Sequence, residues 1–390
     1  MSEWQQHKLG ELCTQITVGH VGSMASRYTE SGIPFLRSLN IKRGRVDLSA
    51  VKYIDEDFHR ELAKSQLLPG DLAIVRTGEP GTTALIPEGL GPLNCSDIVI
   101  ARPGPNVDAR FLCYAINETS QEFVKAHTVG AVQQHFNVKS AKELTIRMPA
   151  LAHQRTISRL LGALDDKIAV NERIAATADD LLRALYQDSC DKSSKAVTIQ
   201  ELGTLIRDSV PASALTGGEH YIGLEHMPRR NMWLSTWGES TELASGKSAF
   251  RSGDVLFGKL RPYFHKVGLA LTTGVCSTDI LVIRPVKQTH LGWLLLALSS
   301  DEVVAHASAV GDGTRMPRTK WKDLGSFGVP WPGDEAAAQL NATVQAVAAR
   351  VRASVLESQA LAALRDTLLP QLMSGRLRVK DAEKIVEDAT

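Results

Sequence analysis

The chain has 390 residues, of which 43% are hydrophobic and 22% are charged, and its formal net charge is +1. This balance is typical of a folded globular protein and excludes a mainly disordered chain. No hydrophobic run reaches the roughly 18 residues that a membrane helix needs, and the N-terminus lacks a secretory pattern. The five cysteines are dispersed, which argues against a disulfide framework and a zinc site. We therefore expect a cytoplasmic protein with no membrane partner.

The sequence repeats itself once. Four pairs of segments match in the same order, at offsets of 181 to 183 residues. One chance match would carry little weight, but four at nearly one spacing indicate two copies of one unit. The unit is too long for a solenoid repeat, so the sequence predicts a duplicated domain. The matching segments are 68–74 with 251–257, 95–103 with 276–285, 146–149 with 327–330, and 183–185 with 365–367.

Each copy begins with a globular part in which strand and helix patterns mix. Short apolar runs bounded by glycine and proline predict strands, and longer stretches between them predict helices. The irregular spacing of these elements argues against a doubly wound sheet, so we expect an α+β fold with two similar mixed α/β domains. The clearest predicted strands are residues 72–75, 98–101, 255–257 and 280–283, and the clearest helices are residues 109–125 and 291–306.

A long helical segment follows each globular part. Residues 153–187 contain no proline and one glycine, and their apolar residues recur at alternating spacings of four and three, which is typical of a heptad seam. The second copy runs from about residue 335 to residue 373, and Pro370 is expected to mark its end. A 35-residue helix is about 52 Å long and cannot bury its stripe within one small domain. The first seam comprises Ile157, Leu161, Leu164, Ile168, Asn171, Ala175, Ala178, Leu182 and Leu185.

We therefore expect the two long helices to pack on each other as an antiparallel coiled coil, which gives the chain an internal pseudo-two-fold repeat. Asn171 stands at a seam position and can fix the register of the pair at some cost in stability. The alternative is that Asn171 lies at the seam edge in water. Ser358 and Arg365 occupy positions where apolar residues are expected, so the register of the second helix stays open.

The sequence predicts five segments. A first target domain and a second one each precede a long spacer helix, and a tail ends the chain. The predicted boundaries are 1–150 and 191–333 for the domains, 151–190 and 334–375 for the helices, and 376–390 for the tail.

No catalytic motif or metal-binding pattern is complete. Residues 246–248 have the end of a phosphate-binding loop without its first glycine. The sequence contains no H-E-x-x-H, no G-x-S-x-G and no Asn-Pro-Pro-aromatic motif. We predict no catalytic residue and no metal ligand, and hence a recognition module in preference to an enzyme.

Several strings in the chain resemble the specificity subunit of a Type I restriction-modification system, and the resemblance covers nearly the whole length. It implies a non-catalytic subunit in which each globular part is a target recognition domain for one half of a bipartite target in double-stranded DNA. It also implies that the helices set the spacer between the half-sites and dock two methyltransferase subunits for adenine N6 methylation. The resembling strings are residues 32–41, 70–78, 144–155, 258–263 and 368–377.

The resemblance implies no cofactor in this chain. S-adenosylmethionine would belong to the methyltransferase subunits. ATP and Mg would belong to motor-nuclease subunits, two of which can join for restriction.

Base edges in the major groove are read by arginine or lysine at guanine and by asparagine or glutamine at adenine. A loop just before the last strand of each domain supplies such residues, and a second set follows an earlier strand. Basic residues near these loops are expected to contact phosphate. The alternative for each of them is an ordinary solvated position. The predicted groove readers are Gln133, Gln134, Arg315 and Arg318; the second set is Arg76, Thr77, Lys259, Arg261 and Tyr263; the phosphate contacts are Arg37, Lys42, Arg43, Lys320 and Lys322.

Two other functions stay open. A stand-alone DNA-binding scaffold protein without methyltransferase partners would bind DNA tightly by itself, whereas the net charge near zero leads us to expect weak binding by the isolated chain. An enzyme with an unrecognised active site would turn over S-adenosylmethionine or ATP.

Overall fold

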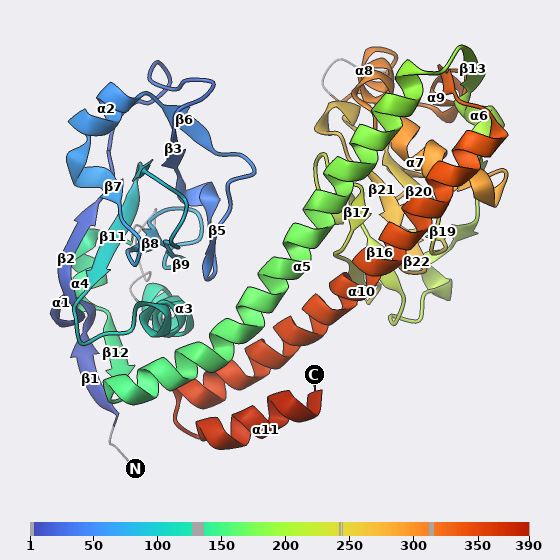
Figure 1. The fold of residues 1–390 in the computed structure, drawn as a ribbon. Helices are drawn as coiled ribbons and strands as arrows, with labels where there is room; N and C mark the ends of the chain where they lie inside the picture. The colour runs from blue at the N-terminus through green and yellow to red at the C-terminus, as the bar shows by residue number, and fades with distance from the viewer. Residues whose placement is uncertain (1–3, 127–135, 242, 244, 312–315, 390) are drawn as a thin grey trace. The chain divides into compact units, whose positions relative to one another are not determined.

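The computed structural model describes residues 4–126, 136–241, 243, 245–311 and 316–389 (Figure 1). The chain folds into two compact units. Unit 1 comprises residues 1–166 and 361–390, and unit 2 comprises residues 167–360. Each unit thus holds one globular copy and parts of both long helices. The five-segment division drawn from the sequence stays a prediction.

Unit 1 contains two four-stranded sheets. Its elements are β1 (Gln5–Lys8), α1 (Leu9–Leu12), β2 (Cys13–Val18), β3 (Ile33–Leu36), β4 (Ile41–Lys42), β5 (Arg45–Val46), β6 (Lys52–Ile54), α2 (Glu56–Glu61), β7 (Gln66–Leu67), β8 (Leu72–Val75), β9 (Thr83–Leu85), β10 (Leu93–Cys95), β11 (Ile98–Pro103), α3 (Ala109–Ala126), α4 (Val138–Glu143), β12 (Thr145–Met148) and α11 (Val379–Ala389). The first sheet has the order β2-β11-β8-β9 and is antiparallel. The second has the order β6-β3-β10-β7 and includes one parallel pair, β3 with β10.

The central strand β8 explains the layering of unit 1. All four of its side chains are apolar and buried, as expected for a strand that is covered on both faces. Leu72 and Ile74 point into a core that includes Phe111 of α3. Ala73 and Val75 point into the other core, which includes residues of the second sheet. One sheet is therefore packed between a helix and another sheet.

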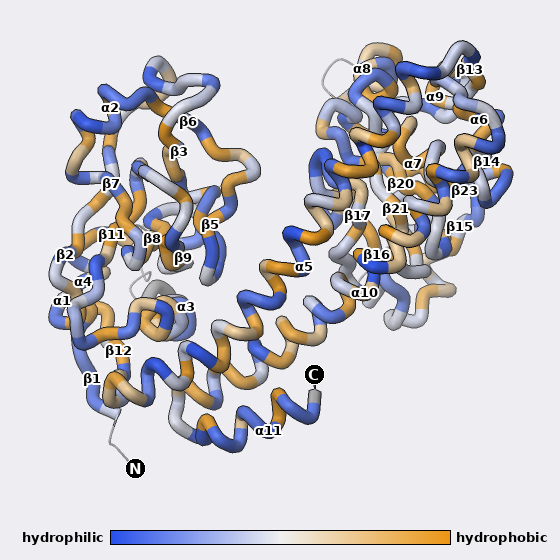
Figure 2. Tube along the Cα trace, in the orientation of Figure 1, coloured by the Kyte–Doolittle hydropathy of each residue, from blue (hydrophilic) through white to orange (hydrophobic). Residues whose placement is uncertain are grey.

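Unit 2 repeats this arrangement. Its elements are β13 (Lys195–Thr198), α6 (Ile199–Leu202), β14 (Gly203–Ile206), β15 (Ser209–Val210), β16 (His220–Ile222), β17 (Trp233–Leu234), β18 (Gly238–Glu239), β19 (Lys247–Phe250), β20 (Val255–Gly258), β21 (Val267–Ala270), β22 (Gly274–Cys276), β23 (Ile280–Pro285), α7 (Leu291–Leu298), α8 (Asp301–Ala309), α9 (Trp321–Gly325) and β24 (Gly328–Trp331). The sheet β14-β23-β20-β21 matches β2-β11-β8-β9, and β17 extends it by one strand. Figure 2 shows hydrophobic residues gathered on β20, β21 and α7.

A buried ion pair recurs at the same place in both units. In unit 1, the Asp71 carboxylate accepts hydrogen bonds from the Leu68 backbone N–H at 2.8 Å and from Arg102 Nε at 3.0 Å. In unit 2, the Asp254 carboxylate accepts them from the Arg251 N–H at 2.8 Å and from Arg284 Nε at 2.7 Å. The preceding glycine has a φ of +89° in one copy and +92° in the other, a conformation that favours glycine. The predicted duplication is confirmed at the level of single contacts.

The first and last strands of each globular copy pair with each other. In unit 1, β1 pairs antiparallel with β12, and Gln5 lies opposite Met148. In unit 2, β13 pairs antiparallel with β24, and Lys195 lies opposite Trp331. The chain thus enters and leaves each copy at one place.

Two long helices follow these last strands, α5 (Leu151–Asp191) and α10 (Asp334–Met373). Within unit 2, Ala175 and Leu182 of α5 share a core with Val344 and Val351 of α10. Within unit 1, Ile157 of α5 shares a core with Leu368 and Leu372 of α10. Early residues of α5 thus lie with late residues of α10, so the helices pack antiparallel. The fold-class prediction of two mixed α/β domains with two long antiparallel helices is confirmed.

Three details of the helix predictions are wrong. The seam does not continue to Leu185, which is 36% exposed; Tyr186 is buried in its place and packs against Trp293. The reason is that a helix with 3.6 residues per turn drifts away from a 3.5-residue repeat. Residues 291–306 form α7 and α8 instead of one helix, since the Ser300 hydroxyl caps a new helix. Pro370 lies inside α10, which ends three residues later.

Asn171 lies inside the helix pair of unit 2 and is 2% exposed, so the alternative that it lies in water is wrong. Its Nδ2 donates hydrogen bonds to Glu357 Oε2 at 2.8 Å and to Ser358 Oγ at 3.2 Å. The first of these bonds holds the pKa of Glu357 below its usual value. Among the described residues, Asn171 Oδ1 and Ser354 Oγ have no hydrogen-bond partner. This polar layer specifies the register and carries a cost in stability.

We expect Asn171→Leu to stabilise the local helix pair by about 1 kcal/mol, because it removes a buried acceptor that lacks a partner. Hydrogen exchange of the α5 amides near residue 171 should slow about fivefold. The control is Asn171→Ala, which leaves a gap and should speed exchange. Equal exchange in all three proteins would contradict the prediction.

The final helix α11 was not predicted, since the sequence interpretation assigned residues 376–390 to a tail. Val379 and Ala382 are buried in the core of unit 1. Within the described part of the chain, no helix is long and apolar enough to cross a membrane. No group of three or more His, Cys, Asp or Glu side chains among the same residues could hold a metal ion.

Candidate nucleic-acid interface

Three segments of unit 2 meet at the end of strand β20. Lys259, the first residue after the strand, donates its backbone N–H to the Asp279 carbonyl at 2.9 Å. The Thr319 N–H donates to the Lys259 carbonyl at 3.0 Å, and the Arg261 N–H donates to the Pro317 carbonyl at 2.8 Å. The backbone therefore fixes Lys259 beside the segment that carries Arg318.

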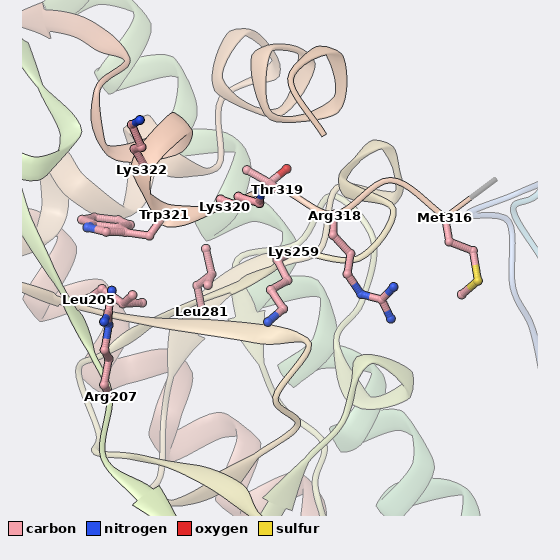
Figure 3. Close-up of a pocket in the computed structure, with 10 residues that line it drawn as sticks. All are labelled: Leu205, Arg207, Lys259, Leu281, Met316, Arg318, Thr319, Lys320, Trp321 and Lys322. Atoms are coloured by element: carbon pink, nitrogen blue, oxygen red, sulfur yellow. The ribbon is translucent and has the colours of Figure 1, made fainter. Parts of the chain in front are cut away.

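A hollow of about 770 Å³ opens beside this junction. Figure 3 shows Lys259 and Arg318 pointing to the same side, with Leu281 beside Lys259 and Trp321 farther along the lining. Half of the lining residues are cationic, and none of the described residues of the lining carries a carboxylate. The lining residues are Leu205, Arg207, Lys259, Leu281, Met316, Arg318, Thr319, Lys320, Trp321 and Lys322.

One cation of this hollow has a carboxylate partner nearby. Arg318 Nε lies 3.2 Å from the Asp279 Oδ1, and these side chains are 49% and 29% exposed. Five of the ten described lining residues are cationic, so this surface is richer in positive side chains than the nearly neutral chain as a whole. Such a surface attracts phosphate, and the fork of an arginine can bind a phosphate while one nitrogen keeps a carboxylate partner.

Unit 1 repeats one hydrogen bond of this junction at the end of β8, the one that corresponds to Thr319 N–H and the Lys259 carbonyl. Arg76 follows this strand as Lys259 follows β20, and the Phe136 N–H donates to the Arg76 carbonyl at 3.1 Å. The guanidinium of Arg76 is 19% exposed and forms a close ion pair with Asp97. The counterpart of Asp97 in unit 2 is Asp279. This backbone contact thus recurs in both units. The arginine that pairs with the equivalent aspartate is 19% exposed in unit 1 (Arg76) and 49% exposed in unit 2 (Arg318).

The other predicted contacts of unit 1 lie on different elements. Arg37 is half-buried and donates a hydrogen bond to the Ala50 carbonyl at 2.7 Å. Its side chain therefore stabilises the segment between residues 37 and 50. Arg43 forms an ion pair with Glu118 of α3 at 3.0 Å. Lys42 is exposed on β4, and Thr77 is exposed directly after Arg76.

The structure brings together four predicted residues of unit 2 around the hollow: Lys259, Arg318, Lys320 and Lys322. Arg261 joins the same junction through its backbone, but it does not line the hollow. Tyr263 is 53% exposed and packs against Phe264, away from this lining. The predicted groove readers Gln133, Gln134 and Arg315 lie outside the described residues.

Sequence reasoning missed Arg207, Met316 and Trp321. Trp321 stands between Lys320 and Lys322, and a basic-aromatic-basic triplet is a signal that could have marked it. Arg207 follows β14 and reaches the hollow only through the pairing of β14 with β23. No local pattern could have revealed that.

Residues 1–178 match the profile of the family described as Type I restriction modification DNA specificity domain. The N-terminal part of the chain, residues 1–178, therefore carries a domain of this Type I specificity family. The Type I restriction enzyme EcoDI specificity subunit of Escherichia coli is 34% identical over 92 residues, which are 23% of this chain and 20% of that protein. The resemblance to specificity subunits drawn from the sequence is confirmed.

Two further members of the Type I group are similar over more residues. The putative type I restriction enzyme MjaX specificity subunit of Methanocaldococcus jannaschii is 22% identical over 182 residues, 44% of this chain and 42% of that protein. The matches thus span less than half of either curated relative's length. The crystal structure of the Type I restriction-modification S subunit from M. genitalium covers 95% of this chain and 96% of its own at a TM-score of 0.56 and 14% identity, which shows a shared fold.

Proposed function

We propose that this chain is the non-catalytic subunit that recognises a bipartite double-stranded DNA target, one half-site for each unit. The observation that carries the proposal is the strand-end hydrogen bond that recurs at Arg76 in unit 1 and at Lys259 in unit 2. A protein that presents one arrangement twice is suited to two half-sites. The match of residues 1–178 to the Type I specificity domain supports the same function.

The cationic hollow of unit 2 is proposed to hold the DNA backbone. Lys259, Lys320 and Lys322 supply point charges, and Arg318 supplies a fork that fits a phosphate. Phosphate contacts position a protein on the duplex, whereas contacts to base edges specify the sequence. We keep that second role for Gln133, Gln134 and Arg315 as a proposal from the sequence. Arg318 and Lys259, which the sequence also predicted as groove readers, are here proposed for phosphate contact because they line the cationic hollow.

We further propose two methyltransferase subunits as partners, one for each copy of the repeat. They would bring S-adenosylmethionine and methylate adenine N6, and two motor-nuclease subunits with ATP and Mg would join for restriction. This chain would hold no cofactor of its own. The helices α5 and α10, with 41 and 40 residues, would set the spacing between the half-sites.

Exchange of residues 1–150 for the same region of another specificity subunit tests the proposal. Because unit 1 and unit 2 have separate cores, we expect the exchange to change one half of the methylated sequence and leave the other half unchanged. Methylation mapping of cells that express the chimera with the cognate methyltransferase measures this. A change in both halves would contradict it.

DNA binding by the purified chain separates this function from that of a stand-alone DNA-binding scaffold. We expect weak binding by the chain alone and tighter binding after the methyltransferase is added, since the chain's net charge is only +1. Tight binding by the chain alone, together with no stable methyltransferase complex, would favour the scaffold.

A further inference from the structure

The loop that follows β20, residues 259–266, has an unusual backbone. It begins with Lys259 and Arg261 of the candidate interface. Arg261 and His265 have φ angles of +51° and +52°, a left-handed conformation that is unfavourable for residues other than glycine. The short helical turn Pro262–Phe264 lies between them. Such a backbone persists only where the surrounding structure holds it, so the contacts at the two ends of the β20 loop fix the position of its cations.

His265 anchors the far end of the β20 loop. Its side chain is buried, with 3% exposure, and its Nε2 lies 2.9 Å from the Ser299 carbonyl, directly after α7. A carbonyl oxygen only accepts hydrogen bonds, so Nε2 carries the proton and donates it. The His265 carbonyl accepts the Arg230 N–H at 2.9 Å. The loop end is therefore attached at Ser299 and at Arg230.

Helix α5 holds both of these attachment points. Arg183 of α5 donates a hydrogen bond to the same Ser299 carbonyl at 2.7 Å. Its Nε donates to Asp179, one turn earlier on α5, at 2.5 Å. The other oxygen of Asp179 accepts the N–H of Met232, two residues after Arg230, at 2.9 Å. Because the Asp179 side chain is 8% exposed and that of Arg183 is 29% exposed, water competes weakly for these bonds.

Unit 1 holds the corresponding loop in another way. The repeat places Arg365 of α10 at the position of the α5 arginine, 182 positions later in the sequence. Arg365 pairs with two aspartates of the long helices, Asp165 and Asp366. The loop after β8 is held at its end by α3, since Asn117 accepts the Thr83 N–H at 3.0 Å and donates to the Thr83 carbonyl at 2.8 Å. Among the described residues, a direct bond from this arginine to the anchor of the loop is thus a feature of unit 2.

We propose that Arg183 is a positioning residue for DNA recognition by unit 2. Through the Ser299 carbonyl it fixes His265, and His265 fixes the β20 loop that carries Lys259. Phosphate contacts set the register of a protein on the duplex, so a displaced β20 loop would misplace the base contacts of the whole unit. Arg183 does not itself line the cationic hollow. This inference rests on the proposed function, and it gives the helix that sets the spacing a second part, in the selection of bases.

The test measures how well the complex of the full chain with its methyltransferase discriminates between DNA sequences. Duplexes with every single-base change in either half-site are methylated as one mixture and counted by sequencing. Arg183→Met keeps the apolar stem and removes the donors, and His265→Asn is too short for the carbonyl but tolerates the left-handed backbone. We expect each variant to lower discrimination about fivefold, the effect of one hydrogen bond, in the half-site that the exchange of residues 1–150 leaves unchanged. The other half-site should be read as in wild type.

The discrimination ratio separates positioning from mere loss of folded protein, because such a loss lowers methylation of every duplex equally. The double variant should lose no more than either single variant, since both act through one carbonyl. The matched control Arg365→Met should keep wild-type discrimination in both half-sites. Unchanged discrimination in Arg183→Met and His265→Asn, additive losses in the double variant, or an equal loss in the control would overturn the positioning role and leave the proposed function standing. A wild-type complex that discriminates in neither half-site would overturn both.

Discussion

The double variant Lys259→Glu, Arg318→Glu should weaken DNA binding by the proposed complex of this chain with a methyltransferase by about two orders of magnitude. Both side chains line the cationic hollow of unit 2 and point to the same side. The double variant also leaves Asp279, which lies 3.2 Å from Arg318 Nε in the wild type, without its partner. Loss of two phosphate contacts should reduce the slope of the logarithm of the binding constant against the logarithm of the salt concentration by about two. Electrophoretic mobility or anisotropy titrations at several salt concentrations measure both quantities.

The control for this experiment is Arg251→Glu. Arg251 precedes β20 and Lys259 follows it, so the control changes a charge at the opposite end of the same strand. We expect its affinity to stay within about twofold of wild type, since a distant exposed charge is screened by salt. An equal loss in the control and the double variant would mean that net charge, and not the hollow, governs binding.

Asp254→Ala should destabilise unit 2 by about 3–5 kcal/mol. The Asp254 side chain is 2% exposed and forms two hydrogen bonds with Arg284, at 2.7 and 2.8 Å. Its removal leaves the guanidinium without its buried partner and frees the Arg251 N–H, which it binds at 2.8 Å. Hydrogen exchange in urea, followed separately for β20 and β8, reports the stability of each unit.

The twin variant Asp71→Ala should have the same effect on unit 1 and spare unit 2. The surface control is Asp57→Ala, because Asp57 is 84% exposed and its ion pair with Arg60 should contribute about 0.5 kcal/mol or less. If Asp254→Ala exposed the β8 amides as much as the β20 amides, the two units would not be independent folding units.

The sequence predicted the repeat and the central strands because their signals are local. The runs at β8 and β20 are wholly apolar, and each follows a Gly-Asp pair that forms the same turn. Pro149 correctly separates β12 from α5. The break at Ser300 was not predicted, since a single cap inside an apolar stretch is a weak signal.

The candidate site could be predicted only in part, because its charge balance depends on residues that are distant in the sequence. The partner of Arg43 is 75 positions away, and that of Arg318 is 39 positions away. No local pattern shows that Arg37 stabilises the segment between residues 37 and 50. Lys320 and Lys322 were found because they are adjacent to Arg318 in the chain, and the backbone junction brings Lys259 to them.

The pairing of first and last strands in each globular copy has a genetic consequence. Because β1 lies beside β12 and β13 lies beside β24, the two ends of a copy are already joined. A recombination event with crossovers just outside such a strand pair would transfer a complete globular copy. No strand of the recipient protein would lose its pairing partner. If each copy reads one half-site, as proposed, a gene of this design would acquire a new half-specificity in one step.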